Sequence, residues 1–282
     1  MSAQTVHLNK YMCQRFPDDF YLVSKTNNFD YMNRVTYGFS KMAESTVVIG
    51  ILARDVADIL PYNLYRLEFL KSLFKDAKLI AYENDSVDKT CQTLLSSMVV
   101  DDVVSESGKF PTMEQDKSLQ RREKMAYCRN RLRDAMIEHN ANYYLLYDAD
   151  ILGGFSYEGI ANSFSYKWDV CGSNSIIYDG NDENIRRLYY DSWAWRDIEN
   201  YEDHDSEDIN LRTYNRGEKP IECMSCFGGL AIYNNIFTHK QYRYTSEDCD
   251  HVTINVPMYD NGAKIVMNPS QLVLYNKTRY VV

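Results

Sequence analysis

Continuous apolar runs alternate along the chain with segments whose apolar residues recur every three or four positions. The clearest run, residues 46–53, is rich in β-branched residues and ends in Arg54 and Asp55. A near-continuous run of this kind is typical of a strand buried on both faces of a parallel sheet. A helical stripe of leucines at residues 61–74 and a second apolar run at residues 77–82 follow it. This order predicts a β-α-β unit early in the chain.

The same alternation continues toward the end of the chain. Apolar periodicity predicts helices at residues 89–98, 115–139 and 157–166. Further apolar runs predict strands at residues 98–104, 143–147, 168–173, 226–233 and 263–269. Residues 1–44 and 179–220 show no clear period, and long irregular insertions often carry binding function. We therefore expect an α/β fold with a Rossmann-like, mixed and mostly parallel sheet flanked by helices, as a single domain over residues 1–282 with residues 1–45 as an N-terminal arm packed on it.

Two carboxylates follow the run at residues 143–147. They are Asp148 and Asp150, spaced one residue apart. Alternate strand residues point the same way, and ligands of α/β sheets bind beyond the carboxyl ends of the strands. Two hard oxygen ligands facing one point suit Mg²⁺ or Mn²⁺, and such ions usually keep waters and bind substrate phosphates. The pair predicts such a site, although two solvated carboxylates at a strand end would give the same pattern.

Other expected strand ends and one expected helix also carry polar chemistry. The strand-end loops are Arg54-Asp55, residues 83–86 and residues 247–251. The helix at 115–139 is rich in arginine, which matches phosphate oxygens in a bidentate way, although most of these side chains are expected to form a solvated face. Together these loops could bind a metal, a diphosphate and a nucleoside, and they could supply a catalytic base.

Composition narrows the possible partners. The net charge of −9 disfavours a nucleic-acid partner, because a phosphate backbone needs a basic face. Residues 1–11 lack the apolar stretch of a signal peptide, and no run approaches the ~18 apolar residues of a membrane span, so we expect a cytoplasmic protein. The seven scattered cysteines are expected to be reduced thiols, and Cys223 and Cys226 have no second CxxC pair to complete a zinc site.

An ordered set of short motifs resembles nucleotide-sugar glycosyltransferases of the GT-A fold. The motifs occupy residues 48–54, 82–90, 126–130, 148–150, 227–233 and 248–251. Each is modest alone, and the resemblance covers roughly residues 46–275. The length and the lack of an anchor are also similar to glycosyltransferases encoded by large algal viruses, such as the chlorovirus xylosyltransferases.

The resemblance implies a UDP-sugar donor, xylose or another sugar, and a glycan or glycoprotein acceptor. It assigns the nucleotide to Arg54, Glu83 and Asp85. Separately, Arg131 is the candidate among the arginines of the 115–139 helix for a contact to the diphosphate. It also implies that Asp150 binds Mn²⁺ or Mg²⁺ and that Asp148 contacts the ribose or the donor sugar. These roles agree with the chemistry, since a divalent ion stabilises the charge that develops on a departing diphosphate.

A later acidic motif would supply the catalytic base of an inverting enzyme. The candidates are Asp250 and, less favoured, Asp248, although either could instead cap a helix. His251 is a further candidate metal ligand, but a lone histidine is more often structural.

Glycines and tryptophans complete the expected site. Gly228 and Gly229 would let the backbone line the sugar pocket, or they could form a bulge. Trp193 and Trp195 would form an acceptor platform, or they could belong to the core.

Three alternatives stay open. Phosphatases of the haloacid-dehalogenase type also use Asp-x-Asp, but on their first strand and with Thr or Val where this chain has Leu152. A non-catalytic sugar-binding protein could retain the same fold. A retaining transferase would not need the second acidic motif.

Overall fold

The computed structural model describes residues 17–18, 21–23, 28–110, 117–181, 184–199, 201 and 207–275. Strand β1 (Thr46–Ala53) pairs in parallel with β2 (Asp76–Asn84) on one side and with β4 (Tyr143–Asp148) on the other. Strand β3 (Asp102–Glu106) continues the parallel sheet beyond β2. The chain thus builds outward from β1 to β3 and then returns to the other side of β1. Such a reversal opens a crevice at the carboxyl ends of the two strands beside it.

The second half of the sheet is mixed. Its strands are β5 (Gly154–Phe155), β6 (Val170–Asn181), β7 (Asn184–Tyr189), β8 (Ile221–Glu222), β9 (Leu230–Tyr233) and β10 (Ile265–Leu274). The strand order is β3-β2-β1-β4-β9-β6-β10-β5, with β7 beside β6 and β8 beside β10. Strand β9 runs antiparallel to β4 and to β6, whereas β6 and β10 are parallel. The start of β9 and the ends of β6 and β10 therefore lie toward the same edge of the sheet as the ends of β1 and β4.

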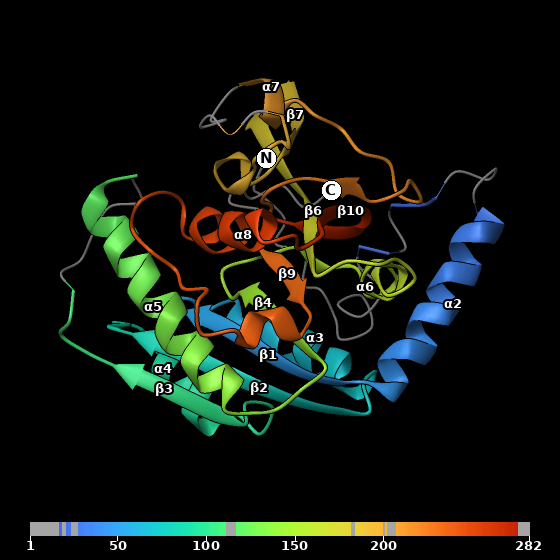
Figure 1. Ribbon diagram of the computed structural model, residues 1–282. Helices are drawn as coiled ribbons and strands as arrows, with labels where there is room; N and C mark the ends of the chain where they lie inside the picture. The colour runs from blue at the N-terminus through green and yellow to red at the C-terminus, as the bar shows by residue number, and fades with distance from the viewer. Residues whose placement is uncertain are drawn as a thin grey trace.

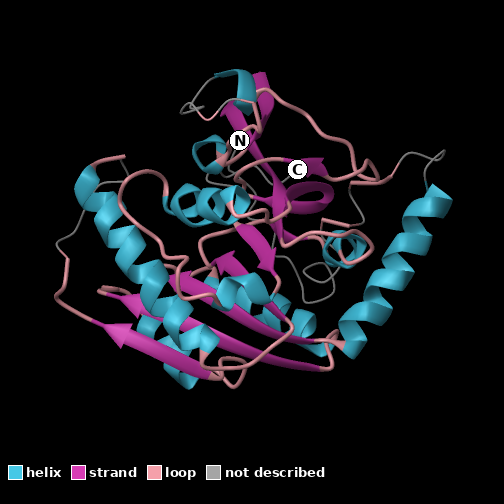
Figure 2. Ribbon diagram, viewed as in Figure 1, coloured by secondary structure: helices cyan, strands magenta, loops and turns pink. Residues whose placement is uncertain are grey.

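Helices cover both faces of the sheet (Figure 2). One face packs on α5 (Leu119–Ile137) and α8 (Asp250–Asp260). The other face packs on α2 (Asn28–Glu44), α3 (Leu60–Ser72), α4 (Thr90–Ser96) and α6 (Tyr157–Ser163). Short helices η1 (Ser192–Ala194), α7 (Glu207–Asn210) and η2 (Asn235–Thr238) lie in the connections. The alternation of strand residues separates the two cores, with Val48 facing one and Val47 and Ile49 facing the other.

Side chains of helix α5 pack directly on β1 at Gly50. A side-chain carbon there would lie 2.2 Å from the sulfur of Met136, so the glycine lets Met136 pack against the strand without moving. The other end of α5 is thereby fixed over the carboxyl ends of β1 and β2 (Figure 1).

The prediction of a mixed α/β sheet flanked by helices is confirmed. The strand expected at residues 46–53 has those bounds, and most paired residues lie in parallel ladders. The prediction that residues 1–44 contain no periodic element was wrong for residues 28–44. They form helix α2, which buries Tyr31, Val35 and Met42. The rest of the expected arm lies mostly outside the described residues. The 179–220 segment also contains regular structure, because β7 returns against β6 as a hairpin.

No helix within the described residues combines the length and the apolar character needed to cross a membrane.

Candidate active site

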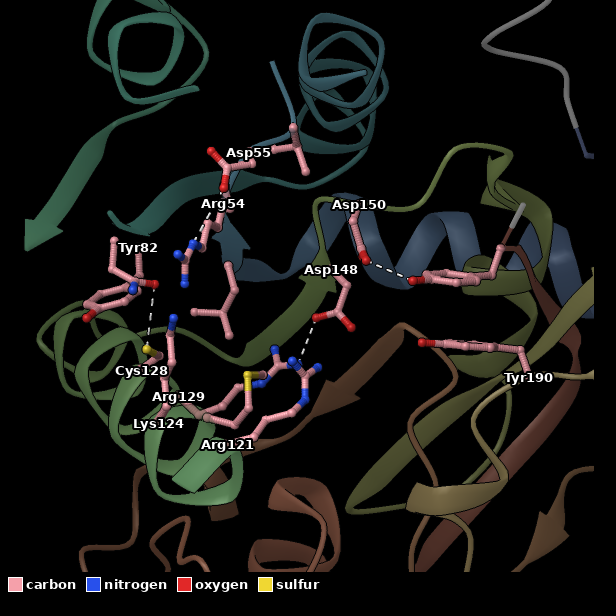
Figure 3. Close-up of a pocket in the computed structure, with 16 residues that line it drawn as sticks. Arg54, Asp55, Tyr82, Arg121, Lys124, Cys128, Arg129, Asp148, Asp150 and Tyr190 are labelled. Atoms are coloured by element: carbon pink, nitrogen blue, oxygen red, sulfur yellow. Dashed lines mark hydrogen bonds and ion pairs between the residues drawn. The ribbon is translucent and has the colours of Figure 1, made fainter. Parts of the chain in front are cut away.

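A cleft of about 470 Å³ opens at the predicted edge of the sheet (Figure 3). The ends of β1, β2 and β4 form its floor, and the first half of α5 forms one wall. Its acidic side chains include Asp148 and Asp150, which follow β4 as the sequence predicted. The site therefore lies at the reversal of strand order between β1 and β4.

Asp148 is held by a buried arginine. Nη2 of Arg129 lies 2.8 Å from Oδ1 of Asp148, and Nε of the same guanidinium lies 2.9 Å from Oδ2 of Asp250. The ring of Phe227 packs under this guanidinium at 5.1 Å. Burial raises the pKa of Asp148 to about 6; Arg129 opposes this shift, and the nearby charge of Asp150 adds to it. Arg129 thus links the strand-end carboxylate to the start of α8.

Asp150 is held from the opposite side of the cleft. The hydroxyl of Tyr275, immediately after β10, donates to Oδ2 of Asp150 at 2.8 Å. The Tyr275 ring stacks on Tyr190 with 3.9 Å between centroids and 7° between planes. Both rings line the cleft, and Figure 3 labels Tyr190 there.

The donor set fits a hard divalent cation that also binds a ligand. Arg129 occupies Oδ1 of Asp148 and Tyr275 occupies Oδ2 of Asp150, and within the described residues nothing binds the other oxygen of either carboxylate. No group of three or more His, Cys, Asp or Glu side chains in the described part of the chain could hold a metal alone. Mg²⁺-type ions commonly bind through one or two carboxylates and complete their shell with water and substrate phosphates. Asp148 and Asp150 would hold such an ion.

The wall formed by α5 is cationic. Lys124 projects from it toward Arg54, which follows β1, and Arg121 also lines the cleft (Figure 3). Arg54 lies 3.6 Å from Asp55, whereas Arg121 and Lys124 have no ion-pair partner among the described residues. Burial and the charge of Arg54 lower the pKa of Lys124. Neighbouring cations without partners favour an anionic ligand, and guanidinium groups match phosphate oxygens.

The loop after β2 is shaped by the acids that the sequence assigned to the nucleotide. Both oxygens of Glu83 accept hydrogen bonds, from the backbone of Ser86 and from the hydroxyl of Ser105, each at 2.8 Å. Asp85 accepts from the backbone of Gly108 at 2.6 Å, which lowers its pKa. Neither residue lines the cleft, whereas their neighbour Asn84 does. The two predicted acids thus support the loop, and the largely buried Asn84 is the residue of this loop that lines the cleft.

Arg131 lies outside the cleft. It forms an ion pair with Glu106 at 3.0 Å, and its side chain is 43% exposed. On the same helix, Arg121 and Lys124 line the cleft instead; Arg131 lies about two turns further along α5 than Lys124, beyond the cleft.

The two glycines act through their backbone. Gly228 and Gly229 both have positive φ angles, of 65° and 76°, which strain other residues. The carbonyl of Gly229 accepts from the backbone N–H of Asp148 at 3.0 Å. The N–H of Gly228 donates to Asp191 at 3.1 Å. They position strand-end acids, and neither lines the cleft itself.

Both predicted base candidates are paired with arginines. The charges of His251 and Arg129 and a hydrogen bond from Arg129 outweigh burial and lower the pKa of Asp250 to about 2. Asp248 is held through both oxygens by the buried Arg196 at 2.8 and 2.9 Å, and its side chain is 24% exposed. Asp250 is the first residue of α8, where a negative charge also favours the helix dipole.

His251 is part of the core. Its ring stacks on Phe227 with 3.5 Å between centroids, and neither buried ring nitrogen has a hydrogen-bond partner among the described residues. Burial lowers the pKa of this histidine to about 3. Because it does not line the cleft, we do not assign it to the metal.

The two tryptophans have different environments. Trp195 is fully buried, its indole N–H donates to Asp197 at 2.9 Å, and it packs on Tyr214. Its burial contradicts an acceptor platform, since no ring face is open to a ligand. Trp193 is only half-buried, and the ammonium of Lys117 lies 5.5 Å from its ring centre.

Three functional candidates were not identified from the sequence. Tyr190 and Tyr275 reach the cleft because β7 returns along β6 and β10 ends beside them. Asp191 has a left-handed backbone, with φ of 74°, and burial, with Asp148 nearby, raises its pKa to about 7. Strain of this kind clusters at functional sites. One signal was visible: the aspartate sits in the irregular segment expected to carry binding function.

No protein-family model matches the sequence, and no curated protein matches it. Similar solved structures include S. aureus TarS 1-349 in complex with UDP-GlcNAc, with 10% identity over 83% of this chain and 59% of that chain and a TM-score of 0.48. GalNAc-T7 with UDP, GalNAc and Mn²⁺ has 9% identity over 91% of this chain and 53% of that chain, with a TM-score of 0.48. The mannosyltransferase PcManGT from Pyrobaculum calidifontis, in complex with GDP-Man and Mn²⁺, has 8% identity over 88% of this chain and 66% of that chain, with a TM-score of 0.47. This chain spans between 53% and 66% of the length of these structures.

Proposed function

We propose that this protein is a metal-dependent glycosyltransferase that moves a sugar from a UDP-sugar to a hydroxyl of a glycan or glycoprotein. The observation that carries the proposal is the arrangement of charge in the cleft. Asp148 and Asp150, each with one oxygen available, face a wall that presents Arg121 and Lys124. Carboxylates for a cation beside cations for an anion suit a metal-bound diphosphate.

The chain's own residues have separable tasks in this reaction. Arg54, Arg121 and Lys124 would bind the diphosphate, and Asn84 would contact the nucleoside. A bound divalent ion would stabilise the negative charge that develops on the departing nucleoside diphosphate. Tyr190 offers an aromatic surface on the opposite side of the cleft, and aromatic faces suit the C–H groups of a sugar.

The acceptor hydroxyl is a poor nucleophile, so an inverting enzyme needs a carboxylate to take its proton. Asp250 and Asp248 remain the proposed bases; neither is among the residues that line the cleft, but Arg129 joins Asp250 to Asp148, which does. Asp250 is kept ionised by Arg129, and an ionised carboxylate is ready to accept a proton, although its low pKa makes it a weak base. Asp248 is the more exposed of the two. Asp250→Asn and Asp248→Asn, each assayed for transfer and for UDP binding, distinguish them: the base variant loses transfer and keeps UDP affinity.

A panel of donors tests the function. The protein is incubated with Mn²⁺, simple sugar acceptors and UDP-xylose, UDP-glucose, UDP-N-acetylglucosamine or GDP-mannose, and glycoside formation is followed by mass spectrometry. We expect turnover of one UDP-sugar, with xylose among the donors supported by the narrower resemblance. Binding of UDP with no turnover of any donor would instead support a non-catalytic sugar-binding protein. NMR of the product's anomeric configuration separates an inverting from a retaining enzyme.

A further inference from the structure

The loop that carries Asp150 is fastened on its backbone. The buried amide of Asn63 on α3 donates to the carbonyls of Ala149 and Ile151, both at 2.9 Å. The amide oxygen of Asn63 in turn accepts from the hydroxyl of Tyr147 at 2.9 Å. The two carbonyls that flank Asp150 are therefore fixed. This arrangement leaves the side-chain torsions of Asp150 as its main freedom.

Tyr275 restricts that remaining freedom. Its hydroxyl donates to Oδ2 of Asp150 at 2.8 Å, while its ring is stacked flat on Tyr190. Its backbone N–H donates to the carbonyl of Ile176 at 2.9 Å, which anchors the residue at the end of the β6–β10 pair.

From this geometry we infer that Tyr275 is a positioning residue for the metal: it orients the Asp150 carboxylate so that Oδ1 faces the cation. The inference rests on the proposed function, which assigns the cation to Asp148 and Asp150. A neutral O–H donor takes one oxygen of the carboxylate and leaves its charge intact. Groups that hydrogen-bond to metal ligands orient them, and their loss typically weakens metal binding 10- to 100-fold.

The Tyr275→Phe variant tests this role with little other change. Phenylalanine keeps the ring, its stacking on Tyr190 and its volume, and it removes only the hydroxyl. Tyr144→Phe is the matched control, because that hydroxyl also belongs to a buried tyrosine and donates to the carbonyl of His139 at 3.0 Å. Tyr144 is near the start of β4, at the end of the strand remote from Asp148. The control thus loses this hydrogen bond, together with a longer one of 3.4 Å from the backbone N–H of Ala141, outside the cleft.

The primary readout is Mn²⁺ binding in the presence of UDP, followed by electron paramagnetic resonance of free Mn²⁺. We expect the dissociation constant of Mn²⁺ to rise about tenfold or more in Tyr275→Phe and to stay within about twofold in Tyr144→Phe. The Mn²⁺ concentration for half-maximal transfer should rise in parallel, with the rate at saturating Mn²⁺ nearly unchanged. Urea denaturation of all three proteins reports the stability lost with each hydroxyl.

Unchanged or tighter Mn²⁺ binding in Tyr275→Phe would overturn the inference, whether or not the variant is less stable. A loss of rate that saturating Mn²⁺ does not restore would also overturn it, since Tyr275 would then act on the reaction itself. A wild-type protein that binds neither Mn²⁺ nor UDP would refute the proposed function instead. The two failures are therefore distinguishable in one set of titrations.

Discussion

The guanidinium of Arg129 lies 2.8 Å from the carboxylate of Asp148, and its side chain is only 3% exposed. The pair joins the middle of helix α5 to the end of strand β4, at the base of the cleft. Arg129 also reaches Asp250 at 2.9 Å, so one buried cation balances two carboxylates from elements far apart in the sequence. The cationic wall and the acidic floor of the cleft are thereby held in a fixed relation.

Replacing Arg129 with glutamine should destabilise the fold strongly. Removing one partner of a buried ion pair strands the other charge, at a typical cost of about 3–5 kcal/mol. Urea denaturation at pH 7.5 measures this loss. Arg131→Gln is the control on the same helix: its partner is Glu106 and its side chain is 43% exposed, so we expect a loss below about 1 kcal/mol. Equal losses in the two variants would show that burial of the Arg129 cluster does not matter.

Lys124 should contribute to binding of the diphosphate. It has no ion-pair partner among the described residues and lines the cleft beside Arg54. A charge-assisted hydrogen bond is worth about 1.5–3 kcal/mol, so Lys124→Met should weaken UDP binding by roughly 10- to 100-fold in calorimetry. Arg131→Gln should bind UDP like the wild type because it lies outside the cleft. Weaker UDP binding in Arg131→Gln, with unchanged binding in Lys124→Met, would instead assign the diphosphate contact to Arg131.

The placement of polar side chains at the strand ends was predictable from the sequence because it depends on local pattern and chain order. The run at residues 143–147 is apolar without helical period, and parallel strands bring Asp148 and Arg54 to one edge. The partners of these residues were not predictable. Tyr275 reaches Asp150 across 125 positions of sequence, and only the order of strands in the sheet brings them together.

Assignments within a single motif failed for a different reason. In the 83–86 loop, Glu83 and Asp85 have the residue types expected of ligand-binding acids, but their carboxylates accept hydrogen bonds from the loop itself. Trp195 likewise has the residue type of an acceptor platform, but its ring is buried. Residue type and spacing do not report which way a side chain faces in an irregular segment.

Acid should destabilise the folded protein through His251. Its pKa is lowered from an ordinary 6.5 to about 3, because its ring is buried. The folded state therefore holds the neutral ring, and stability is lost as pH falls below 6.5 toward 3, where only the unfolded chain takes up the proton. Between pH 7.5 and pH 5 this loss amounts to about 2 kcal/mol, at 1.36 kcal/mol per pH unit below 6.5.

His251→Leu isolates this contribution, because leucine is apolar and of similar size. The raised pKa values of Asp148 and Asp191 act in the opposite sense, adding stability as pH falls through about 7 and 6, and they are common to both proteins. We expect the free energy of unfolding of the variant to gain about 2 kcal/mol relative to the wild type between pH 7.5 and pH 5. A difference that does not change with pH would mean that His251 titrates normally.

Substitutions of the two tryptophans should have different effects on stability, because Trp195 belongs to the core and Trp193 is partly exposed. Trp195→Ala empties a fully buried site and should cost about 3–5 kcal/mol in urea denaturation. Trp193→Ala removes a half-buried ring and should cost about 1 kcal/mol. If Trp193 contributes to the acceptor site, its variant also raises the KM for the acceptor and leaves the KM for the donor unchanged. Similar stability losses in both variants would contradict this division.

Release of nucleoside diphosphate from a UDP-sugar, measured with Mn²⁺ and with EDTA, tests the central claim most directly. The wild-type protein and Asp150→Asn, which keeps the shape of the side chain and removes its charge, are compared side by side. We predict release by the wild type with Mn²⁺, none with EDTA, and at least a hundredfold loss in Asp150→Asn, a change that corresponds to about 2.7 kcal/mol. Release that persists in EDTA and in the Asp150→Asn variant would contradict a metal–diphosphate site at Asp148 and Asp150.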